Sequence, residues 1–246
     1  LSKSIENAIV GPGGIMNQHR KKMQLEWKEN TRKYPNPIGT TGRRPEEDEF
    51  QETVDDVSLK LKLDSLADGA ILDAGSSNGY LMKRLAPRAK IITGIDFCHE
   101  PLIQGKELYP EMMFAQGEIT QLPFSDQMFD RIISYSLFHY LPSHEIVFKA
   151  TAELFRILAP GGRLMIGDLL SQDHRHLIPK DDQERWSSKE RAYMHQIQNW
   201  TFVSLEKMCD LLKQLGAQSV EVLSQVRQKR VNQYRFDIVA DKKVSQ

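Results

Sequence analysis

Cysteine is nearly absent from this chain of 246 residues, which carries only Cys98 and Cys209. Two thiols this far apart form neither a metal-binding spacing nor a disulfide framework, so we expect no metal site and a reducing, cytoplasmic location. Long apolar runs are lacking too, and none has the length that spans a membrane. The N-terminal residues also lack the basic-then-apolar layout of a signal peptide, so we expect no membrane partner.

A net charge of either sign is missing as well, because 33 Lys and Arg residues balance 33 Asp and Glu residues. Proteins that bind nucleic acid usually carry a clear basic excess, so we expect no nucleic-acid partner. The hydrophobic fraction of 40% and the charged fraction of 27% are ordinary for a globular protein. The length suits one large domain or a domain with a cap, acting as a monomer or a homodimer.

Short apolar segments alternate with helical patterns along most of the chain. The five expected strands that alternate in this way cover residues 70–73, 91–96, 112–115, 129–135 and 163–168. This rhythm predicts an α/β fold with a doubly wound, mostly parallel sheet and helices on both faces. Residues 220–223 and 234–240 are separated by a polar segment too short for a crossover helix, which favours an antiparallel hairpin at the sheet edge and seven strands in all.

Two segments lie outside this rhythm. Residues 1–49 are polar, with Met16, Met23, Trp27 and Tyr34 at roughly helical spacing, so we expect an N-terminal helical arm. The arm is either a cap on the main domain, residues 50–246, or a purely structural extension. Residues 170–200 are rich in His, Arg and aromatic residues and are expected to form an insertion over the active site.

A small-residue loop after the first strand is the most informative motif. It reads Asp73-Ala-Gly75-Ser-Ser77-Asn-Gly79-Tyr80, and such a loop brings backbone N–H groups and a helix N-terminus close to a ligand. A dinucleotide-binding loop would place a small residue where Tyr80 stands. The spacing of Asp73, Gly75, Ser77 and Gly79 resembles instead the signature of class I S-adenosylmethionine-dependent methyltransferases, with Ser77 in place of the usual middle glycine.

Further motifs in the same order extend this resemblance over residues 71–168. They are Asp96 at the end of the second strand, Glu118 after the third, and the Ala159-Pro-Gly-Gly162 turn before the fifth. The resemblance implies a Rossmann-like fold, the cofactor S-adenosyl-L-methionine and the product S-adenosyl-L-homocysteine. From this resemblance and from the neighbours of its motifs we expect ten cofactor contacts. They are Asp73, Gly75, Ser76, Ser77, Gly79, Asp96, Phe97, Glu118, Ile119 and Ser134.

The implied reaction is an in-line displacement of the sulfonium methyl group by a nucleophile. Ligands bind beyond the carboxyl ends of parallel strands, so the end of the fourth strand should face the methyl group. We expect His139 there as a general base, because its ordinary pKa suits proton transfer, and Tyr135 as a positioning hydroxyl or wall. The alternative for His139 is a cap or a packing partner of Tyr140.

The acceptor is expected to be a small anionic metabolite that is methylated on oxygen or nitrogen, in natural-product or surface-polysaccharide precursor biosynthesis. Cationic and aromatic side chains of the arm and the insertion would recognise it, namely Tyr34, Arg185, Arg191 and His195. The alternatives are a methyltransferase for protein or nucleic acid, a non-catalytic S-adenosylmethionine-binding module, and a nicotinamide dehydrogenase, which Tyr80 disfavours.

Overall fold

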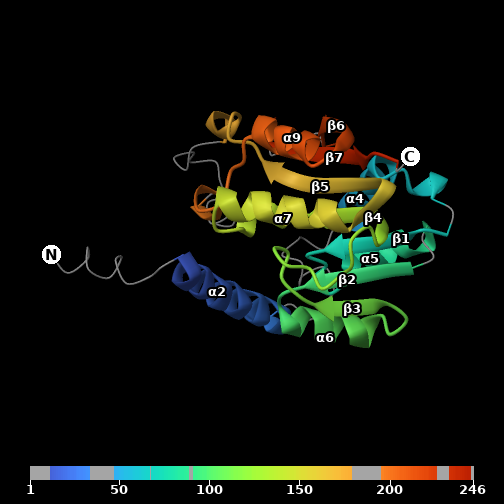
Figure 1. Ribbon diagram of the computed structural model, residues 1–246. Coiled ribbons are helices and arrows are strands. Elements are labelled where there is room, and N and C mark those ends of the chain that lie inside the picture. Colours follow the sequence, from blue (N-terminus) through green and yellow to red (C-terminus); the bar gives the residue numbers. More distant parts are fainter. Residues whose placement is uncertain are drawn as a thin grey trace.

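A seven-stranded sheet organises the computed structural model, which describes residues 12–33, 47–66, 68–88, 91–178, 195–225 and 233–244 (Figure 1). The strand order is β3-β2-β1-β4-β5-β7-β6. Strands β1 to β5 pair in parallel, and β7 pairs antiparallel with both β5 and β6. The strands are β1 Ala70–Ala74, β2 Ile91–Asp96, β3 Met113–Gln116, β4 Phe129–Tyr135, β5 Leu158–Leu170, β6 Ala217–Ser224 and β7 Arg235–Lys242.

This topology confirms the predicted fold class, including the antiparallel closing hairpin. The chain moves outward from β1 to β3 and then returns to place β4 on the other side of β1. Such a reversal of strand order is where open α/β sheets bind their ligands. The carboxyl ends of β1 and β4 therefore mark the expected position of the site.

The helices cover both faces of the sheet. They are α2 Pro12–Lys33, α4 Glu47–Lys60, α5 Tyr80–Leu85, α6 His99–Leu108, α7 His144–Ile157 and α9 Leu205–Gln214, with short 3-10 turns η1 Leu63–Ser65, η2 Ala86–Arg88, η3 Phe138–Tyr140 and η4 Arg175–Leu177. Ser143 and Ser204 begin α7 and α9 by accepting a hydrogen bond from the backbone N–H three residues on.

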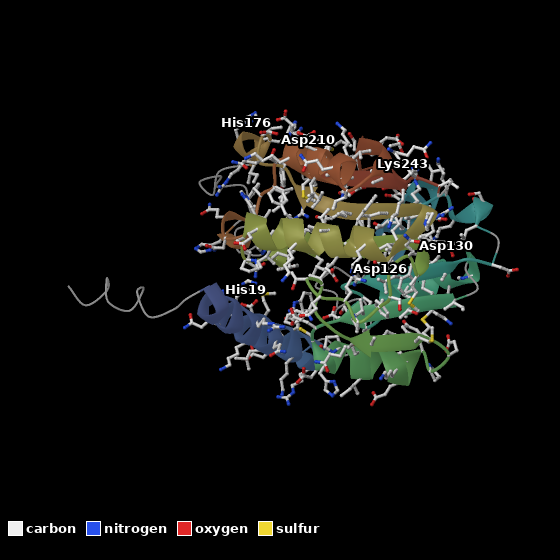
Figure 2. The ribbon with its side chains drawn as sticks, viewed as in Figure 1. His19, Asp126, Asp130, His176, Asp210 and Lys243 are labelled. Carbon is white, nitrogen blue, oxygen red and sulfur yellow. The ribbon has the colours of Figure 1, made fainter. Side chains whose placement is uncertain are left out.

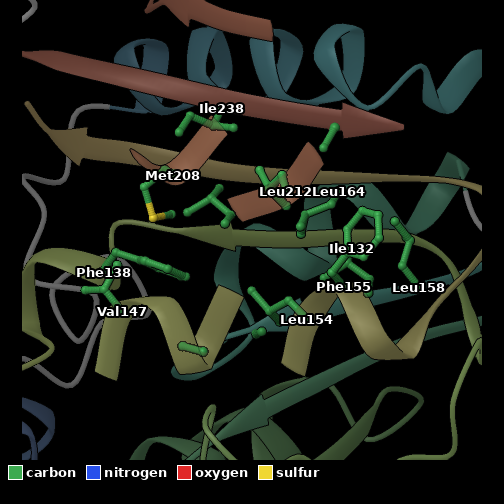
Figure 3. Packing of buried hydrophobic residues seen from close by; sticks show 14 of the residues in the cluster. Ile132, Phe138, Val147, Leu154, Phe155, Leu158, Leu164, Met208, Leu212 and Ile238 are labelled. Atoms are coloured by element: carbon green, nitrogen blue, oxygen red, sulfur yellow. The ribbon is translucent and has the colours of Figure 1, made fainter. Parts of the chain in front are cut away.

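Alternation along the strands builds two cores. Leu72, Ile132 and Leu164 belong to the cluster under α7 and α9 (Figure 3), and their neighbours Ile71 and Ile133 belong to the cluster under α4 and α5. Successive side chains of a strand point to opposite faces, so each central strand supplies both layers. Because helices pack on both faces of the sheet, the positions of the strand ends are fixed.

Helix α2 lies along the edge of the molecule beside α6 (Figure 1). Met23 is buried, and Trp27 packs edge-on against Tyr140 with ring centroids 5.9 Å apart. The expected N-terminal helix is therefore present and rests on the main domain, although the division into domains stays a prediction. In the described part of the chain, no helix is both long and apolar enough to cross a membrane.

Candidate active site

A cavity lies at the carboxyl ends of β1, β2, β3 and β4, beneath α2. The strand-end segments that line it are 73–77, 95–97, 117–120 and 135–137, and the side chains that α2 contributes are His19, Arg20, Met23 and Trp27. The position agrees with the rule for open parallel sheets. The glycine loop and the arm, which are far apart in the sequence, face the same space.

The glycine loop has the backbone conformation that its residue types suggest. Gly75, Ser77 and Gly79 have φ angles of 85°, 50° and 76°, in the left-handed region. The N–H groups of Gly75 and Ser76 donate to the carbonyl of Ile95 at 2.8 and 3.1 Å, which ties the loop to β2. Ser77 adopts this conformation without being glycine, and such strain is typical of ligand-binding loops.

Two serine hydroxyls of this loop have no hydrogen-bond partner in the described part of the structure. The Oγ atoms of Ser76 and Ser77 are both buried, and both residues line the cavity. A buried polar atom without a partner is costly, and in native proteins such atoms are usually satisfied by a ligand or by water. The loop therefore fits a polar ligand that supplies the missing hydrogen bonds.

Asp96 is held in a fixed orientation at the end of β2. Its Oδ2 accepts from the Ser77 N–H and its Oδ1 from the Cys98 N–H, both at 2.9 Å. Burial raises the pKa of Asp96; the hydrogen bonds from Cys98 and Ser77 oppose this shift, and the neighbouring Glu118 adds to it. Each carboxylate oxygen keeps a lone pair for a ligand hydroxyl.

Glu118 also lines the cavity, and α2 reaches it. The Arg20 guanidinium forms an ion pair with its carboxylate, with a hydrogen bond of 2.8 Å from Nε to Oε1. Nearby, His19 donates from Nε2 to the Tyr140 carbonyl at 2.7 Å, and Figure 2 marks His19 on α2. Lys28 adds a third link, to Glu100 at 3.0 Å, and lowers the pKa of that carboxyl through a hydrogen bond.

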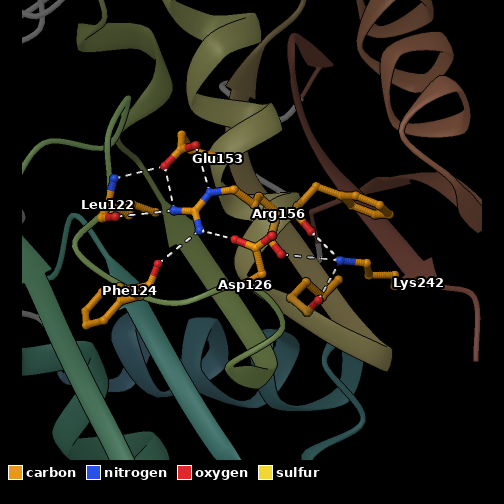
Figure 4. Close-up of polar contacts among 8 residues, drawn as sticks. Leu122, Phe124, Asp126, Glu153, Arg156 and Lys242 are labelled. Carbon is orange, nitrogen blue, oxygen red and sulfur yellow. Dashed lines mark hydrogen bonds and ion pairs between the residues drawn. The ribbon is translucent and has the colours of Figure 1, made fainter. Parts of the chain in front are cut away.

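Arg156 braces the loop that carries Glu118 (Figure 4). Its guanidinium donates to the carbonyls of Leu122 and Phe124 and pairs with Asp126 and Glu153 at 2.6 and 2.9 Å. These contacts tie the loop after β3 to α7. The wall of the cavity that contains Glu118 is thus supported from outside by a charged network.

Eight of the ten predicted cofactor contacts line the cavity, and Gly79 and Ser134 do not. The Gly79 N–H donates to the Ser76 carbonyl at 2.8 Å, and a Cβ there would lie 2.7 Å from the Phe114 ring. The Ser134 hydroxyl donates to the Ala74 carbonyl at 2.9 Å and is fully buried. Both residues shape the site from behind rather than face the cavity.

The two residues predicted for catalysis occupy different places. Tyr135 lines the cavity, and its ring lies so close to Gly167 that a Cβ there would be 2.4 Å away. The His139 ring is buried and does not line the cavity; it packs against Tyr140 and Trp200 at centroid distances of 4.2 and 4.4 Å. This is the packing arrangement that was the alternative for His139, and its role as a base stays a prediction.

The predicted acceptor contacts lie mostly beyond the described residues. Tyr34, Arg185 and Arg191 fall outside them, and His195 is exposed and does not line the cavity. Among the described residues, no group of three or more His, Cys, Asp or Glu side chains is arranged to hold a metal ion. None of these four predicted contacts is seen at the cavity in the described part of the chain, so an anionic acceptor stays a prediction.

Sequence reasoning missed a strained pair formed by the residue after β4 and a residue near the end of β5. Ser136 lines the cavity and has a φ of 61°, and Asp168 has a φ of 63°. The Ser136 hydroxyl donates to Oδ2 of Asp168 at 2.5 Å. Only the position of Ser136, directly after a parallel strand, could have indicated it from the sequence.

Comparison with known proteins finds similarity over the central part of the chain. Residues 72–166 match the family described as "Methyltransferase domain". The demethylmenaquinone methyltransferase of Beutenbergia cavernae is 30% identical over 99 residues, and the malonyl-[acyl-carrier protein] O-methyltransferase of Erwinia billingiae is 30% identical over 106 residues. These matches cover 40% and 43% of this chain, and the chain spans about two-fifths of each relative's length.

A solved structure matches over a larger part of the chain. The N-methyltransferase NodS from Bradyrhizobium japonicum, in complex with S-adenosyl-L-homocysteine, covers 88% of this chain and 97% of its own with a TM-score of 0.62. At 18% identity this similarity concerns the fold alone. It extends the match beyond the central segment to the helices and strands on either side.

Proposed function

Because residues 72–166 match the methyltransferase-domain family, we propose that this protein transfers a methyl group from S-adenosylmethionine to a small-molecule acceptor. The observation that supports this most directly is the glycine loop itself, in which two serine residues line the cavity and keep buried hydroxyls without a partner among the described residues. The pre-oriented carboxylate of Asp96 at the same strand edge adds to it.

In this proposal, the cofactor lies across the carboxyl ends of β1 and β2. Asp96 accepts hydrogen bonds from the two ribose hydroxyls, and the loop from Asp73 to Ser77 holds the amino-acid part. Phe97, Glu118 and Ile119 form the wall beside the adenine, because they follow β2 and β3 and line the same cavity. Arg20 balances the charge of Glu118 on that wall.

The cofactor supplies the activated methyl group, so the protein's contribution is to position and desolvate the reactants. The acceptor atom forms a bond to the methyl carbon while the carbon–sulfur bond breaks, the sulfur keeps the electron pair, and the acceptor loses a proton. Holding the two reactants in line can supply about 7–11 kcal/mol of the barrier reduction. Helix α2 covers the cavity and in this way helps to exclude water from it.

A small acceptor is favoured because apolar side chains of α2 and α4, namely Met23, Trp27 and Phe50, line the cavity. An apolar, enclosed space suits a small organic molecule better than a polymer. An anionic acceptor held by Arg185 and Arg191 stays our prediction. Replacing both by Gln should then raise the KM of a carboxylated acceptor steeply, and an unchanged KM would count against it.

The decisive experiment combines binding with transfer. Calorimetry on the full chain should detect S-adenosylhomocysteine and not NAD, which separates a methyltransferase from a dehydrogenase. Transfer is then measured with methyl-labelled S-adenosylmethionine and a panel of hydroxyl, amine and carboxylate compounds, with bulk tRNA as the macromolecular arm. Binding without transfer to any acceptor would identify a binding module, and no binding would overturn the proposal.

A further inference from the structure

We propose that Ser136 orients the acceptor by accepting a hydrogen bond from its reacting hydroxyl or amine group. Asp168 and Arg235 act as positioning residues behind it. This inference rests on the proposed methyl transfer and goes beyond it, because it assigns a hydrogen-bond-donating class of acceptor. Carbon acceptors, whose reacting atom donates no such bond, are disfavoured.

The hydrogen bond between Ser136 and Asp168 has a defined direction. The Ser136 hydroxyl donates its only hydrogen to Oδ2 of Asp168 at 2.5 Å. Because Asp168 forms an ion pair with Arg235, its carboxylate accepts and does not donate, so the hydrogen belongs to Ser136. Ser136 lines the cavity, so what remains for a ligand there is the lone pairs of its Oγ atom. The group that meets it must be a donor.

The backbone around the pair is strained in a way that serves this contact. Ser136 and Asp168 both have left-handed φ angles, although neither is glycine. Asp168 lies where the pairing of β5 with β7 shifts register, between Ile166 and Leu169. Irregularities of this kind re-aim side chains next to active sites, and such strain persists only where the surroundings over-determine it.

Buried charged side chains around Ser136 and Asp168 hold this strained conformation in place. Arg235 pairs with Oδ1 of Asp168 at 2.6 Å, and the two side chains are only 5% and 12% exposed. The Asp168 N–H donates to Oδ1 of Asp237 at 2.8 Å, and Oδ2 of Asp237 pairs with Lys60 at 2.6 Å. The Asp168 carboxylate therefore has little freedom to turn, and neither does the hydroxyl that it holds.

The location suits an acceptor rather than the cofactor. Ser136 follows the end of β4, on the opposite side of β1 from β2 and Asp96. A ligand that extends from the glycine loop toward β4 would bring its reactive end to this serine. Tyr135 flanks the same position, and its hydroxyl lies 3.4 Å from the Gln225 amide that also contacts Asp168.

The test uses the full chain saturated with S-adenosylhomocysteine and three probe molecules of similar shape. 4-Nitrophenol and 4-nitroaniline carry a donor group, and nitrobenzene does not. We expect the wild-type complex to bind at least one of the two donors about tenfold more tightly than nitrobenzene, measured by calorimetry at a pH at which the phenol is protonated. The Ser136→Gly variant keeps the positive φ without strain and should lose this preference.

Gln127→Gly is the matched control, because it also replaces a residue of positive φ by glycine, but at a position that does not line the cavity. It should keep the preference for the donor probes. Equal preference in Ser136→Gly and wild type, or no preference in wild type, would overturn the inference. If the wild-type chain does not bind S-adenosylhomocysteine, that result would instead contradict the proposed function.

Discussion

The two ends of the cavity are built differently. The proposed cofactor end consists of one short loop and the residues after β2 and β3, and backbone N–H groups of that loop and of Cys98 make its polar contacts with the end of β2. The acceptor end at β4 depends on side chains brought together from distant segments, such as Ser136, Asp168 and Arg235. The first can be conserved as a motif, whereas the second can vary without changing the fold.

This difference has a functional meaning. One fold hosts many reactions when the part that binds the common ligand is local and the part that selects the substrate is assembled from several elements. The cofactor end should therefore respond to single changes with large losses of affinity. The acceptor end should respond with changes of selectivity at unaltered cofactor affinity.

The largest expected effect is that of Asp96→Asn on cofactor affinity. The amide cannot accept on both sides, so one backbone N–H and one ribose hydroxyl lose a charged partner, and we expect S-adenosylhomocysteine to bind about 100-fold more weakly. Asp130→Asn is the control, because Asp130 also accepts from a backbone N–H, that of Ala70, at the opposite end of the sheet (Figure 2). Equal losses in both variants would show that the effect is on folding.

The same residue gives a prediction about pH. Burial raises the pKa of Asp96 above 3.8, so its carboxylate becomes protonated at a higher pH than an ordinary aspartate as the solution is acidified. Cofactor affinity should fall through that raised pKa, and Asp96→Asn should flatten the profile. Without cofactor, the contribution of Asp96 to the free energy of unfolding changes with pH in the opposite direction. A raised carboxyl pKa stabilises the folded protein at low pH, and this stabilisation is lost as the pH rises through the raised pKa.

A smaller effect is expected from adding one methyl group to the glycine loop. Gly75→Ala strains a φ of 85° and brings a Cβ to 2.9 Å from Leu137, so we expect about a tenfold loss of cofactor affinity. Gly161→Ala has nearly the same backbone conformation, with a φ of 73°, but lies away from the cavity. Both should lower the free energy of unfolding by about 1–2 kcal/mol. Calorimetry should show that only the first weakens binding.

The contrast between the two ends also explains what the sequence predicted. The mostly parallel sheet, the antiparallel hairpin and the loop from Asp73 to Ser77 follow from local patterns: the alternation of strands with helices, turn residues and glycine spacing. The acceptor end could not be predicted in the same way, because the contact of Ser136 with Asp168 depends on strand register and on a bulge 32 residues away. Local patterns do not specify such pairs.

Element boundaries show a related limit. The sequence predicts that residues 160–162 separate a helix from a strand beginning at Arg163, but β5 already begins at Leu158 and bulges opposite β4 between the Leu158 and Arg163 pairings. Proline and glycine are tolerated at a bulge, so they do not mark the end of the element there. Gly79 and Ser134 do not line the cavity and their hydrogen bonds go to the protein, so their contact with the cofactor stays a prediction.

Arg20 links the arm to the cofactor end, and its effect should be smaller again. Its ion pair with Glu118 is formed by side chains that are 39% and 30% exposed, and such pairs contribute at most about 1 kcal/mol. Arg20→Met should change cofactor affinity by about threefold, and salt should reduce the difference. Lys22→Met, on the same helix with an exposed partner in Glu26, should change nothing.

The smallest effect on turnover is expected for His139→Gln, in an assay with whichever panel compound accepts the methyl group. The His139 ring packs between Tyr140 and Trp200 and does not line the cavity, so we expect turnover to fall less than tenfold, with the change mainly in stability. A well-placed general base contributes about 10²–10⁴-fold. A loss of that size, at unaltered cofactor affinity and with a flattened pH profile, would establish His139 as the base.

Tyr135→Phe provides the matched comparison for that experiment, because Tyr135 lines the cavity and its hydroxyl can be removed without changing the ring that packs on Gly167. If the acceptor end selects by side-chain contacts, Tyr135→Phe should alter the KM of the acceptor more than His139→Gln does. The reverse order would mean that the acceptor approaches from the side of Trp200 and the insertion. The acceptor end would then extend beyond the strand edge, and selectivity would depend on residues of the insertion more than on Ser136.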